Sequence, residues 1–303
     1  MFDRRFSESR TRARVEGLEA RVFLAAQQPL VAQTNLISDQ AGVALVQDPN
    51  LLNPWGVAFD PAGGELWISE NNAGVASLYN VSGISAPTPL TPTVIVPGGG
   101  STPTSAQPSN PTGQVFAGGT GFPITENGVT MNSFFVFVGE DGAITGWNPS
   151  LDLNHAVIAV DNSAGGAVYK GATLAQTSSG TDLFVANFNS GHIEVYDSSF
   201  ANVTPSSGFS DRTIPKGYAP FNVQDVGGQL YVTYAKQDAL KQNDVPGAGH
   251  GFVDVFDTSG KLIHRLQRGA FLNAPWGVTV APSTWGRLAG DVLVGQFGSG
   301  RID

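Results

Sequence analysis

A chain of 303 residues with 41% apolar residues can bury a core in one large domain or in two ordinary ones. Glycine (38 residues) and proline (19) are frequent, whereas charged residues make up only 14%, a balance typical of short strands and tight turns rather than of helices. Cysteine is absent, which excludes disulfides, cysteine-ligated zinc and a thiol nucleophile.

The net charge of −9 is unevenly distributed along the chain. Residues 1–28 carry a net charge of +2, so residues 29–303 carry −11. An acidic body repels phosphate backbones, which argues against nucleic acid as a partner. No run approaches the roughly 18 consecutive apolar residues of a membrane-spanning helix, so we also predict no membrane span.

Residues 1–28 are predicted to be a basic targeting or disordered segment that precedes a folded domain at 29–303. They contain the stretch LEARVFLAA (18–26), in which Glu19 and Arg21 interrupt the apolar block of about 7–15 residues that an ordinary secretion signal needs. The stretch resembles the LEPR-x-LL motif of planctomycete exported and surface proteins, with Ala20 in place of proline. That resemblance implies an extracytoplasmic location, secreted or at the cell surface. A plain amphipathic helix is the alternative.

The body of the chain contains an internal repeat. Its two clearest copies read LNPWGVAFDP (52–61) and LNAPWGVTVAP (272–282), and weaker copies begin near residues 111, 169 and 219. Spacings of 57, 58, 51 and 55 residues separate the shared positions, which are Gly56, Gly113, Gly171, Asn222 and Gly277. Self-similarity at a regular spacing of this kind is the signature of a repeat architecture.

Each copy is followed by a predicted β-hairpin. In ELWISENNAGVASLYN (65–80) and DLFVANFNSGHIEVYD (182–197), two largely apolar strands flank a turn rich in Gly and Asn. An outer strand is supplied by further apolar segments at 91–97, 155–161 and 261–267, which gives about four strands per repeat. One four-stranded sheet cannot bury two apolar faces by itself, but copies packed radially against one another can.

We therefore predict an all-β fold, a β-propeller of four-stranded blades. A β-sandwich also uses frequent hairpins, but it has no reason to repeat a Pro-Trp-Gly anchor at Trp55 and again at Trp276. Because these two tryptophans belong to the repeat, they are predicted to pack between blades rather than to stack on a ligand.

The residues of the repeat resemble those of known protein families. The pattern N-x-G-x-I-x-V-Y-D at 189–197 resembles NHL-type propellers. Three further stretches resemble one uncharacterised family of exported bacterial propellers, whose members sometimes carry PEP-CTERM-type sorting tags: QTNLISDQAG (33–42), GAITGWNPSLD (142–152) and APFNVQ (219–224). The resemblance covers residues 30–303 and implies a fold and a location, but no activity. The resemblance also implies a ring of six blades. Because the sequence contains five copies of the repeated anchor, we predict that the last blade is truncated at the C-terminus and that segment 30–38 would close it.

The candidate binding position is the end of the first hairpin strand in each repeat, because equivalent positions of a propeller converge at one rim of the central channel. The residues at this position are Glu70, Glu140, Asn187, Tyr234 and Gln296. Carboxylate and amide oxygens are suitable ligands for calcium, so one interpretation is a calcium ion held by Glu70, Glu140 and Asn187. The other interpretation is that turns favour such residues for backbone reasons alone.

The sequence lacks a P-loop ending, a G-x-S-x-G elbow and any metal-binding spacing of histidines. The polar insertion at 235–251 is predicted to be a solvated loop with one helical turn. The function predicted from these observations is an exported or surface-associated binding or scaffold module for a protein or glycan. A calcium-dependent hydrolase of the lactonase kind, with its site in the central channel, is the alternative.

Overall fold

The computed structural model describes residues 33–81, 87–101 and 107–303. The N-terminal segment predicted for residues 1–28, together with its boundary at residue 29, lies outside the described residues. Within the described part of the chain, no helix has the length and the apolar character needed to cross a lipid bilayer.

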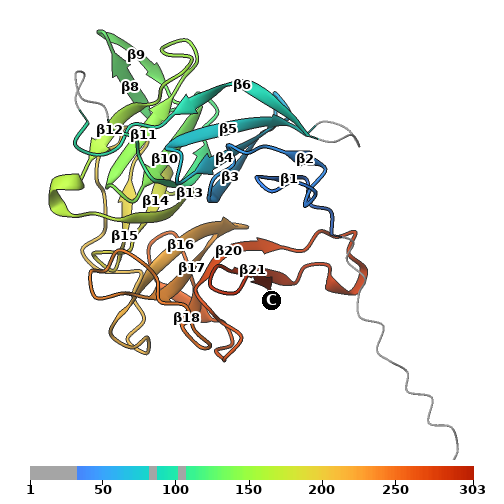
Figure 1. Cartoon of the computed structure of the whole chain (residues 1–303). Coiled ribbons are helices and arrows are strands. Elements are labelled where there is room, and N and C mark those ends of the chain that lie inside the picture. Colours follow the sequence, from blue (N-terminus) through green and yellow to red (C-terminus); the bar gives the residue numbers. More distant parts are fainter. Residues whose placement is uncertain (1–32, 82–86, 102–106) are drawn as a thin grey trace, which may run out of the picture. The chain divides into compact units, whose positions relative to one another are not determined.

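Five antiparallel sheets follow one another along the chain, numbered here as blades 1 to 5 (Figure 1). The inner strand of each blade carries the repeated anchor, and a hairpin leads from it toward the outer edge. Blade 1 consists of β3 (Pro54–Asp60), β4 (Glu65–Glu70), β5 (Val75–Asn80) and β6 (Thr88–Ile95). Blade 2 consists of β7 (Pro111–Phe116), β10 (Phe135–Gly139), β11 (Ala143–Trp147) and β12 (Val157–Asp161). Blade 3 consists of β13 (Tyr169–Thr177), β14 (Gly180–Asn187) and β15 (His192–Tyr196). Blade 4 consists of β16 (Tyr218–Val226), β17 (Gln229–Lys236), β18 (Gly251–Phe256) and β19 (Leu262–Arg265). Blade 5 consists of β20 (Pro275–Val280), β21 (Val292–Gln296) and β22 (Arg301–Ile302). The predicted all-β propeller is confirmed, with five blades.

The number of strands per blade differs from the prediction in two places. Blades 1, 2 and 4 have the four strands expected, but blades 3 and 5 have three in the described part of the chain. In blade 3 the segment after β15 begins as an outer strand, since Asn202 forms a bridge with Tyr196, and then departs from the sheet. Proline at 205 contributes to this departure, because it has no N–H to donate to a ladder.

Short elements outside the sheets include an additional hairpin, β8 (Pro123–Glu126) and β9 (Val129–Asn132), between the first two strands of blade 2. Single 3₁₀ turns lie at Ser163–Gly165 (η1) and Gly286–Leu288 (η2). The helical turn predicted within 235–251 is wrong. There β17 continues to Lys236, and an isolated antiparallel bridge joins Gln237 to Asp244.

The segment predicted to close the last blade lies elsewhere in the part that the structure describes. β1 (Ile37–Ser38) pairs in parallel with β2 (Val46–Gln47), not with blade 5. The reason is apolar burial, since Ile37 and the buried Leu51 pack over Ile68 and Tyr79 of blade 1.

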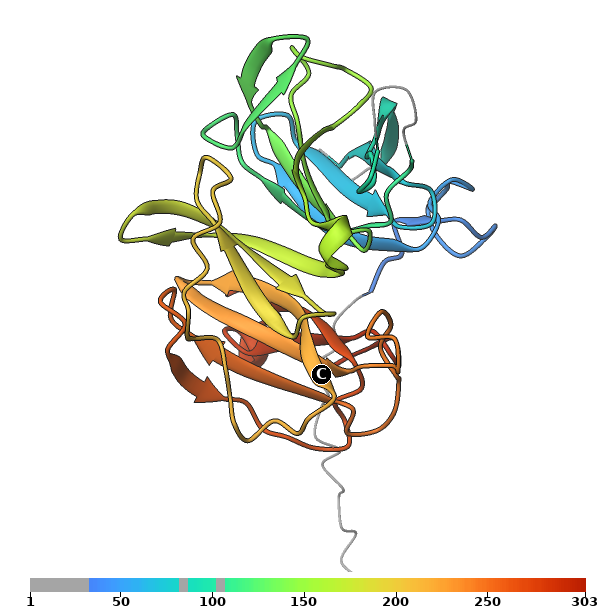
Figure 2. The same ribbon diagram turned by 90° about the vertical axis from the view of Figure 1, so that its left-hand side faces the viewer.

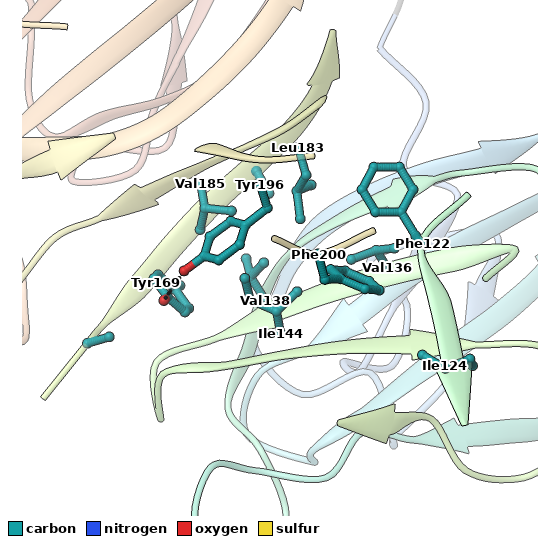
Figure 3. Close-up of a cluster of buried hydrophobic side chains, with 12 residues drawn as sticks. Phe122, Ile124, Val136, Val138, Ile144, Tyr169, Leu183, Val185, Tyr196 and Phe200 are labelled. Carbon is teal, nitrogen blue, oxygen red and sulfur yellow. Dashed lines mark hydrogen bonds between the residues drawn. The ribbon is translucent and has the colours of Figure 1, made fainter. Parts of the chain in front are cut away.

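The core lies between neighbouring blades rather than at one centre. Figure 3 shows the cluster between blades 2 and 3, where Val136 and Val138 of β10 meet Leu183 and Val185 of β14. These residues lie two apart along their strands, so they share one face of each sheet. Similar clusters lie between blades 1 and 2 and between blades 3 and 4. Each sheet thus buries its apolar faces against the sheets beside it.

Glycine at the repeated anchor position allows the inner strands to approach one another at backbone distance. A Cβ on Gly56 would lie 2.9 Å from the Gln114 nitrogen of the next blade, and one on Gly113 would lie 2.6 Å from the Ala172 nitrogen. At Gly171 a Cβ would lie 3.0 Å from the Cα of Asn222. These contacts leave no room for a Cβ, which explains why the repeat has glycine at these three positions. The inner strands thus pack closely in succession from β3 of blade 1 to β20 of blade 5, and Figure 2 shows blades 3 and 4 side by side.

The two repeated tryptophans lie together, as their place in the repeat predicts. The rings of Trp55 and Trp276 meet edge to face with centroids 5.8 Å apart, and Phe221 of blade 4 lies 5.9 Å from Trp55. Residues of blades 1, 4 and 5, distant in sequence, thus join one aromatic cluster. Packing between blades is therefore confirmed for this pair.

Replacing Gly113 with valine is expected to lower the free energy of unfolding by about 2 kcal/mol or more, because overpacking a close contact typically costs about 1–3 kcal/mol. The same substitution at Gly277 is the matched control, since no atom lies within 4 Å of a Cβ built there. Its effect is expected to stay within about 0.5 kcal/mol. Urea unfolding of both variants measures the difference, and equal losses would contradict the proposed role of the glycine.

Candidate functional site

The five residues predicted from the alignment occupy equivalent places in the fold. Three of them end the second strand of their blade, and Tyr234 lies two residues before the end of β17. Each of the four is paired with a residue at or near the start of the inner strand, in the pairs Pro54–Glu70, Tyr169–Asn187, Pro220–Tyr234 and Pro275–Gln296. In blade 2 the fifth residue, Glu140, lies one residue beyond the end of β10, and its N–H donates to the Asn110 carbonyl oxygen at 3.0 Å. Their equivalence along the repeat was therefore predictable from sequence.

Their side chains nevertheless do not form the predicted ring around the channel. Tyr234 lies on the same face of β17 as Leu230 and Val232, inside the cluster between blades 3 and 4. Asn187 shares its face of β14 with Val185, which lies in the cluster between blades 2 and 3. Because side chains alternate along a strand, the one-residue offset in blade 2 sends Glu140 to the opposite side from the others.

Asn187 and Gln296 instead hold neighbouring backbone in place. The Asn187 amide donates to Glu194 at 2.6 Å, and its carbonyl oxygen accepts from the N–H of Val168 at 3.3 Å. The Gln296 side-chain oxygen accepts from the N–H of Asn273 at 2.8 Å. Both amides thus order the loops at this rim.

Glu70 is fully buried, and neither oxygen of its carboxyl group has a hydrogen-bond partner among the described residues within ordinary geometry. It shares its face of blade 1 with Ser77 and lies near Asp48, which accepts a hydrogen bond from Tyr79 at 2.9 Å. Burial, and to a lesser degree the Asp48 charge, raises the pKa of Glu70 to about 7. Glu70 is therefore suited to holding a proton inside blade 1.

Glu140 takes part in the most highly charged contact at the channel mouth. Its carboxylate forms an ion pair with the ammonium group of Lys170, and it accepts a hydrogen bond from the Asn71 amide at 3.1 Å. The Lys170 side chain is 2% exposed, and its nitrogen lies 5.2 Å from the ring centroid of Trp55 and 5.8 Å from that of Phe188. One carboxylate and two aromatic faces thus compensate a cation withdrawn from water.

The backbone of Lys170 is anchored as firmly as its side chain. Its carbonyl oxygen accepts a hydrogen bond from the Trp276 indole at 2.8 Å. Lys170 therefore connects its own blade 3 to blade 1 through Trp55, to blade 2 through Glu140 and to blade 5 through Trp276. A residue with partners in three other blades holds the mouth of the channel in one geometry.

A polar cleft of about 230 Å³ opens beside this ion pair. Its walls come from blade 2, from the start of blade 3 and from the 235–251 insertion, and consist of Asn110, Glu140, Asp141, Val168, Gln242 and Asn243. Asp141 is fully engaged, because its carboxylate accepts from the N–H groups of Gly99, Asn110 and Ala143 and from the Ser109 hydroxyl. The Gln242 side chain has no hydrogen-bond partner among the described residues. The cleft therefore combines a fixed wall with an amide group free to bind a ligand.

The central channel itself offers little space. Its cavity of about 130 Å³ is lined by the inner strands of all five blades, with Trp55, Gln114, Ala172, Gln224 and Trp276 among the lining residues. The glycines at the crossings draw the strands together, so the channel is narrow. The cleft at its mouth is the more accessible site.

The described residues contain no group of three or more His, Asp or Glu side chains placed to hold a metal ion. At Glu140, the Lys170 ammonium already occupies a carboxylate oxygen, so a calcium ion there would have to displace it. Glu70 is buried within blade 1, and Asn187 of blade 3 is bonded to Glu194. Calcium binding by Glu70, Glu140 and Asn187 stays a prediction.

Sequence reasoning missed Lys170, Asn110 and the two amides of the insertion. Lys170 had a usable signal, because it is the one charged residue in the apolar stretch AVYKGATLA at 167–175. A charge at the start of an inner strand must face the channel mouth or find a partner. Gln242 and Asn243 had no such signal, since a polar insertion has the same composition wherever it folds.

No family model matches the chain. Two curated relatives come from Acanthamoeba polyphaga mimivirus. Uncharacterized protein L690 is 32% identical over 277 residues, which are 88% of this chain and 69% of that protein. This chain belongs to the same family as L690. Uncharacterized protein R648 is 28% identical over 274 residues, covering 88% of this chain and 65% of its own length. The chain thus spans about two thirds of the length of these relatives.

Solved structures of low sequence identity resemble this family member in fold. The Dos1 propeller is 14% identical with a TM-score of 0.45, covering 84% of this chain and 57% of that chain. Virginiamycin B lyase from Staphylococcus aureus is 12% identical with a TM-score of 0.47, covering 82% and 64%. A gluconolactonase from Xanthomonas campestris is 15% identical with a TM-score of 0.40, covering 56% and 52%. Likeness at this level concerns the fold alone, and the bacterial family, export and sorting tags implied by the sequence stay predictions.

Glu70→Gln is expected to reduce the pH dependence of stability. A carboxyl group whose pKa is raised by folding holds its proton more tightly in the folded state. Its contribution is therefore fully present below the usual glutamate pKa of 4.5 and is lost as the pH rises through about 7. Thermal unfolding between pH 4.5 and 8 should show a steeper loss of Tm for the wild type than for Glu70→Gln.

Glu126→Gln, on the partly exposed hairpin β8–β9, is the matched control and should retain the wild-type pH dependence. Parallel Tm curves for the wild type and Glu70→Gln would show that Glu70 is an ordinary carboxylate.

Proposed function

We propose that this protein is a binding propeller that takes a neutral, hydroxyl-rich ligand, such as the terminal sugar of a glycan, in the cleft beside Glu140. The observation that carries the proposal is the make-up of this cleft, in which amides and carboxylates of blade 2 and the insertion surround one apolar residue, Val168. Amides both donate and accept hydrogen bonds, and so do sugar hydroxyls, which makes the two chemically matched.

Size and charge narrow the class of ligand further. The volume of about 230 Å³ lies below the roughly 300–1,000 Å³ of pockets that hold drug-sized molecules, so one sugar unit is a suitable occupant. Glu140 and Asp141 line the cleft, whereas the Lys170 ammonium is buried against Glu140. Two carboxylates and one ammonium leave a net negative charge at the cleft, which repels an anionic ligand but not a neutral one.

Binding is favoured over catalysis by the state of the charged groups. Glu140 is held by Lys170 and Asn71, and Asp141 accepts four hydrogen bonds. A general acid or base needs a proton that it can exchange with substrate, and groups saturated by structural partners are poorly suited to that task. They are well suited to presenting a rigid surface.

Mutation of the insertion should separate ligand binding from folding. The double variant Gln242→Ala/Asn243→Ala is expected to lose at least about tenfold in affinity, which corresponds to about 1.4 kcal/mol, with Tm unchanged. A glycan array identifies the ligand, and isothermal titration calorimetry measures its affinity for each variant. Gln40→Ala, an exposed amide in the 33–47 segment, is the matched control and should bind as the wild type does.

Two results would overturn the proposal: no glycan retained on the array, or equal affinity for the double variant and the wild type. A thermal shift with calcium chloride that disappears in Glu70→Gln/Glu140→Gln would instead support the calcium-dependent hydrolase.

We also propose that the propeller works outside the cytoplasm, on a secreted or cell-surface target. The support is the stretch LEARVFLAA within the basic residues 1–28, which resembles an export motif. Fusion of residues 1–28 to a reporter enzyme should carry the reporter out of the cytoplasm in a planctomycete host. A charge-reversed version, with Arg4, Arg5 and Arg10 changed to Glu, is the control. Retention of both fusions in the cytoplasm would contradict the proposed location.

A further inference from the structure

A buried carboxyl group in blade 4, Asp254, takes no part in the candidate cleft. It shares one face of β18 with Phe252 and Phe256, and it is paired across the sheet with Val232, so it faces the apolar cluster between blades 3 and 4. Asp254 is fully buried, and no donor among the described residues reaches either of its carboxyl oxygens. An ionised carboxylate without a partner is costly in such a place, which favours the protonated form.

A second carboxyl group, that of Asp211, lies against Asp254. Asp211 belongs to residues 205–217, the connector between blades 3 and 4, which contains no strand or helix. Its side chain has no exposed surface, and it accepts hydrogen bonds from Arg265 at 2.5 and 2.9 Å and from Arg268 at 3.0 Å. The hydrogen bonds from Arg265 hold the pKa of Asp211 well below its usual range, so this carboxyl group stays ionised.

The two carboxyl groups need one proton between them. Two ionised carboxylates only repel each other, whereas a protonated Asp254 can donate a hydrogen bond to the ionised Asp211. Burial, and after it the charge of Asp211, raises the pKa of Asp254 to about 7. The other charged or titratable groups that face Asp254 in the described part of the chain are Arg265, Arg268 and Tyr234. The two arginines already hold Asp211, and burial raises the pKa of Tyr234, which therefore stays neutral.

Asp211 is on the more mobile of the two elements. Asp254 is held in the middle of its sheet, because β18 pairs with β17 on one side and with β19 on the other. The connector has no such ladder. Its other contacts with blade 4 include the ring of Phe209, which packs in the cluster, and the Phe209 N–H, which donates to the Gly260 carbonyl oxygen at 2.8 Å. A second negative charge beside Asp211 would therefore displace the connector rather than the strand.

The connector also contributes to the wall of a pocket of about 520 Å³. Residues 204–210 line this pocket together with Ser190, Asn202 and residues 192–194 of β15. Asp211 is the next residue along the chain after this part of the wall. The place of the connector on blade 4 therefore determines how wide the pocket is.

We propose that Asp254 and Asp211 form a proton-operated latch. With one proton between them, the pair holds the connector on blade 4 and keeps the pocket beside β15 narrow. When that proton passes to water, the two carboxylates repel each other, the connector separates from blade 4 and the pocket opens. The latch uses no residue of the cleft beside Glu140, so it is independent of the proposed ligand.

The direction of the pH effect follows from the raised pKa of Asp254. A carboxyl group whose pKa is raised by folding contributes stability that is fully present below its usual pKa, 3.8 for Asp254, and is lost as the pH rises through about 7. The latch is therefore closed in acid and open above neutral pH.

Hydrogen exchange of the wild-type protein, followed by mass spectrometry, tests the latch. Protection factors, which remove the pH dependence of intrinsic exchange, are compared for peptides within residues 205–217. They are expected to fall at least about tenfold between about pH 5 and pH 8 and to level off above about pH 7, because the opening then no longer releases a proton. Constant protection of the connector over this range would overturn the proposal, whatever the variants do.

Two variants assign the effect to the latch. Asp254→Asn has an amide that can donate to Asp211 at every pH, so its connector should stay protected throughout. Glu70→Gln is the matched control, because Glu70 is equally buried and its pKa is also raised to about 7, but it lies in blade 1. This control should leave the fall at residues 205–217 unchanged. A fall of wild-type size in Asp254→Asn would contradict the latch, and so would an equal reduction in both variants, which would indicate unfolding of the whole domain.

Discussion

The close approach of the inner strands is the constraint on which the rest of this structure depends. At Gly56 and Gly113, backbone of one blade lies against backbone of the next, and at Gly171 the backbone lies against Asn222 of blade 4, so that none of the three positions has room for a Cβ. This approach brings the hydrophobic faces of adjacent sheets within packing distance, so that clusters such as Val136, Val138, Leu183 and Val185 form between blades. Dispersion and burial reward that packing, but only when the sheets are near enough to exclude water.

The same geometry creates the channel mouth. Once the strands converge, the residues at the start of each inner strand meet, and Trp55 and Trp276 come into contact from opposite ends of the sequence. Lys170 is drawn into this cluster, where its charge is tolerated because Glu140 and two aromatic faces surround it. A buried lysine whose carboxylate partner were lost would be costly, so the pair fixes the wall of the adjacent cleft. Architecture and candidate site are thus consequences of one arrangement.

Much of this architecture could be predicted from residue patterns. The anchor at Trp55 and Trp276, the regular spacing of the glycines and the hairpins after them all depend on local sequence, and the structure contains each of them. The outer strands of blades 3 and 5 could not be predicted in the same way, because an edge strand depends on where the following loop leads. The segment after β15 leaves its sheet toward blade 4, where the N–H of Phe209 donates to the Gly260 carbonyl oxygen at 2.8 Å.

The repeat spacing, the alternation within hairpins and the glycines at the anchors determined the fold class and the equivalence of Glu70, Glu140, Asn187, Tyr234 and Gln296. Each is a property of neighbours along the chain, and short-range backbone preferences suffice to express it. Only the tertiary structure decided which way those side chains face and what they meet. A shift of one residue turns a side chain to the other side of its sheet, and so Glu140 reaches Lys170 while Tyr234 is buried between blades. The cleft was likewise beyond local reasoning, because Asn110 and Gln242 come together only when the blades close around their common channel.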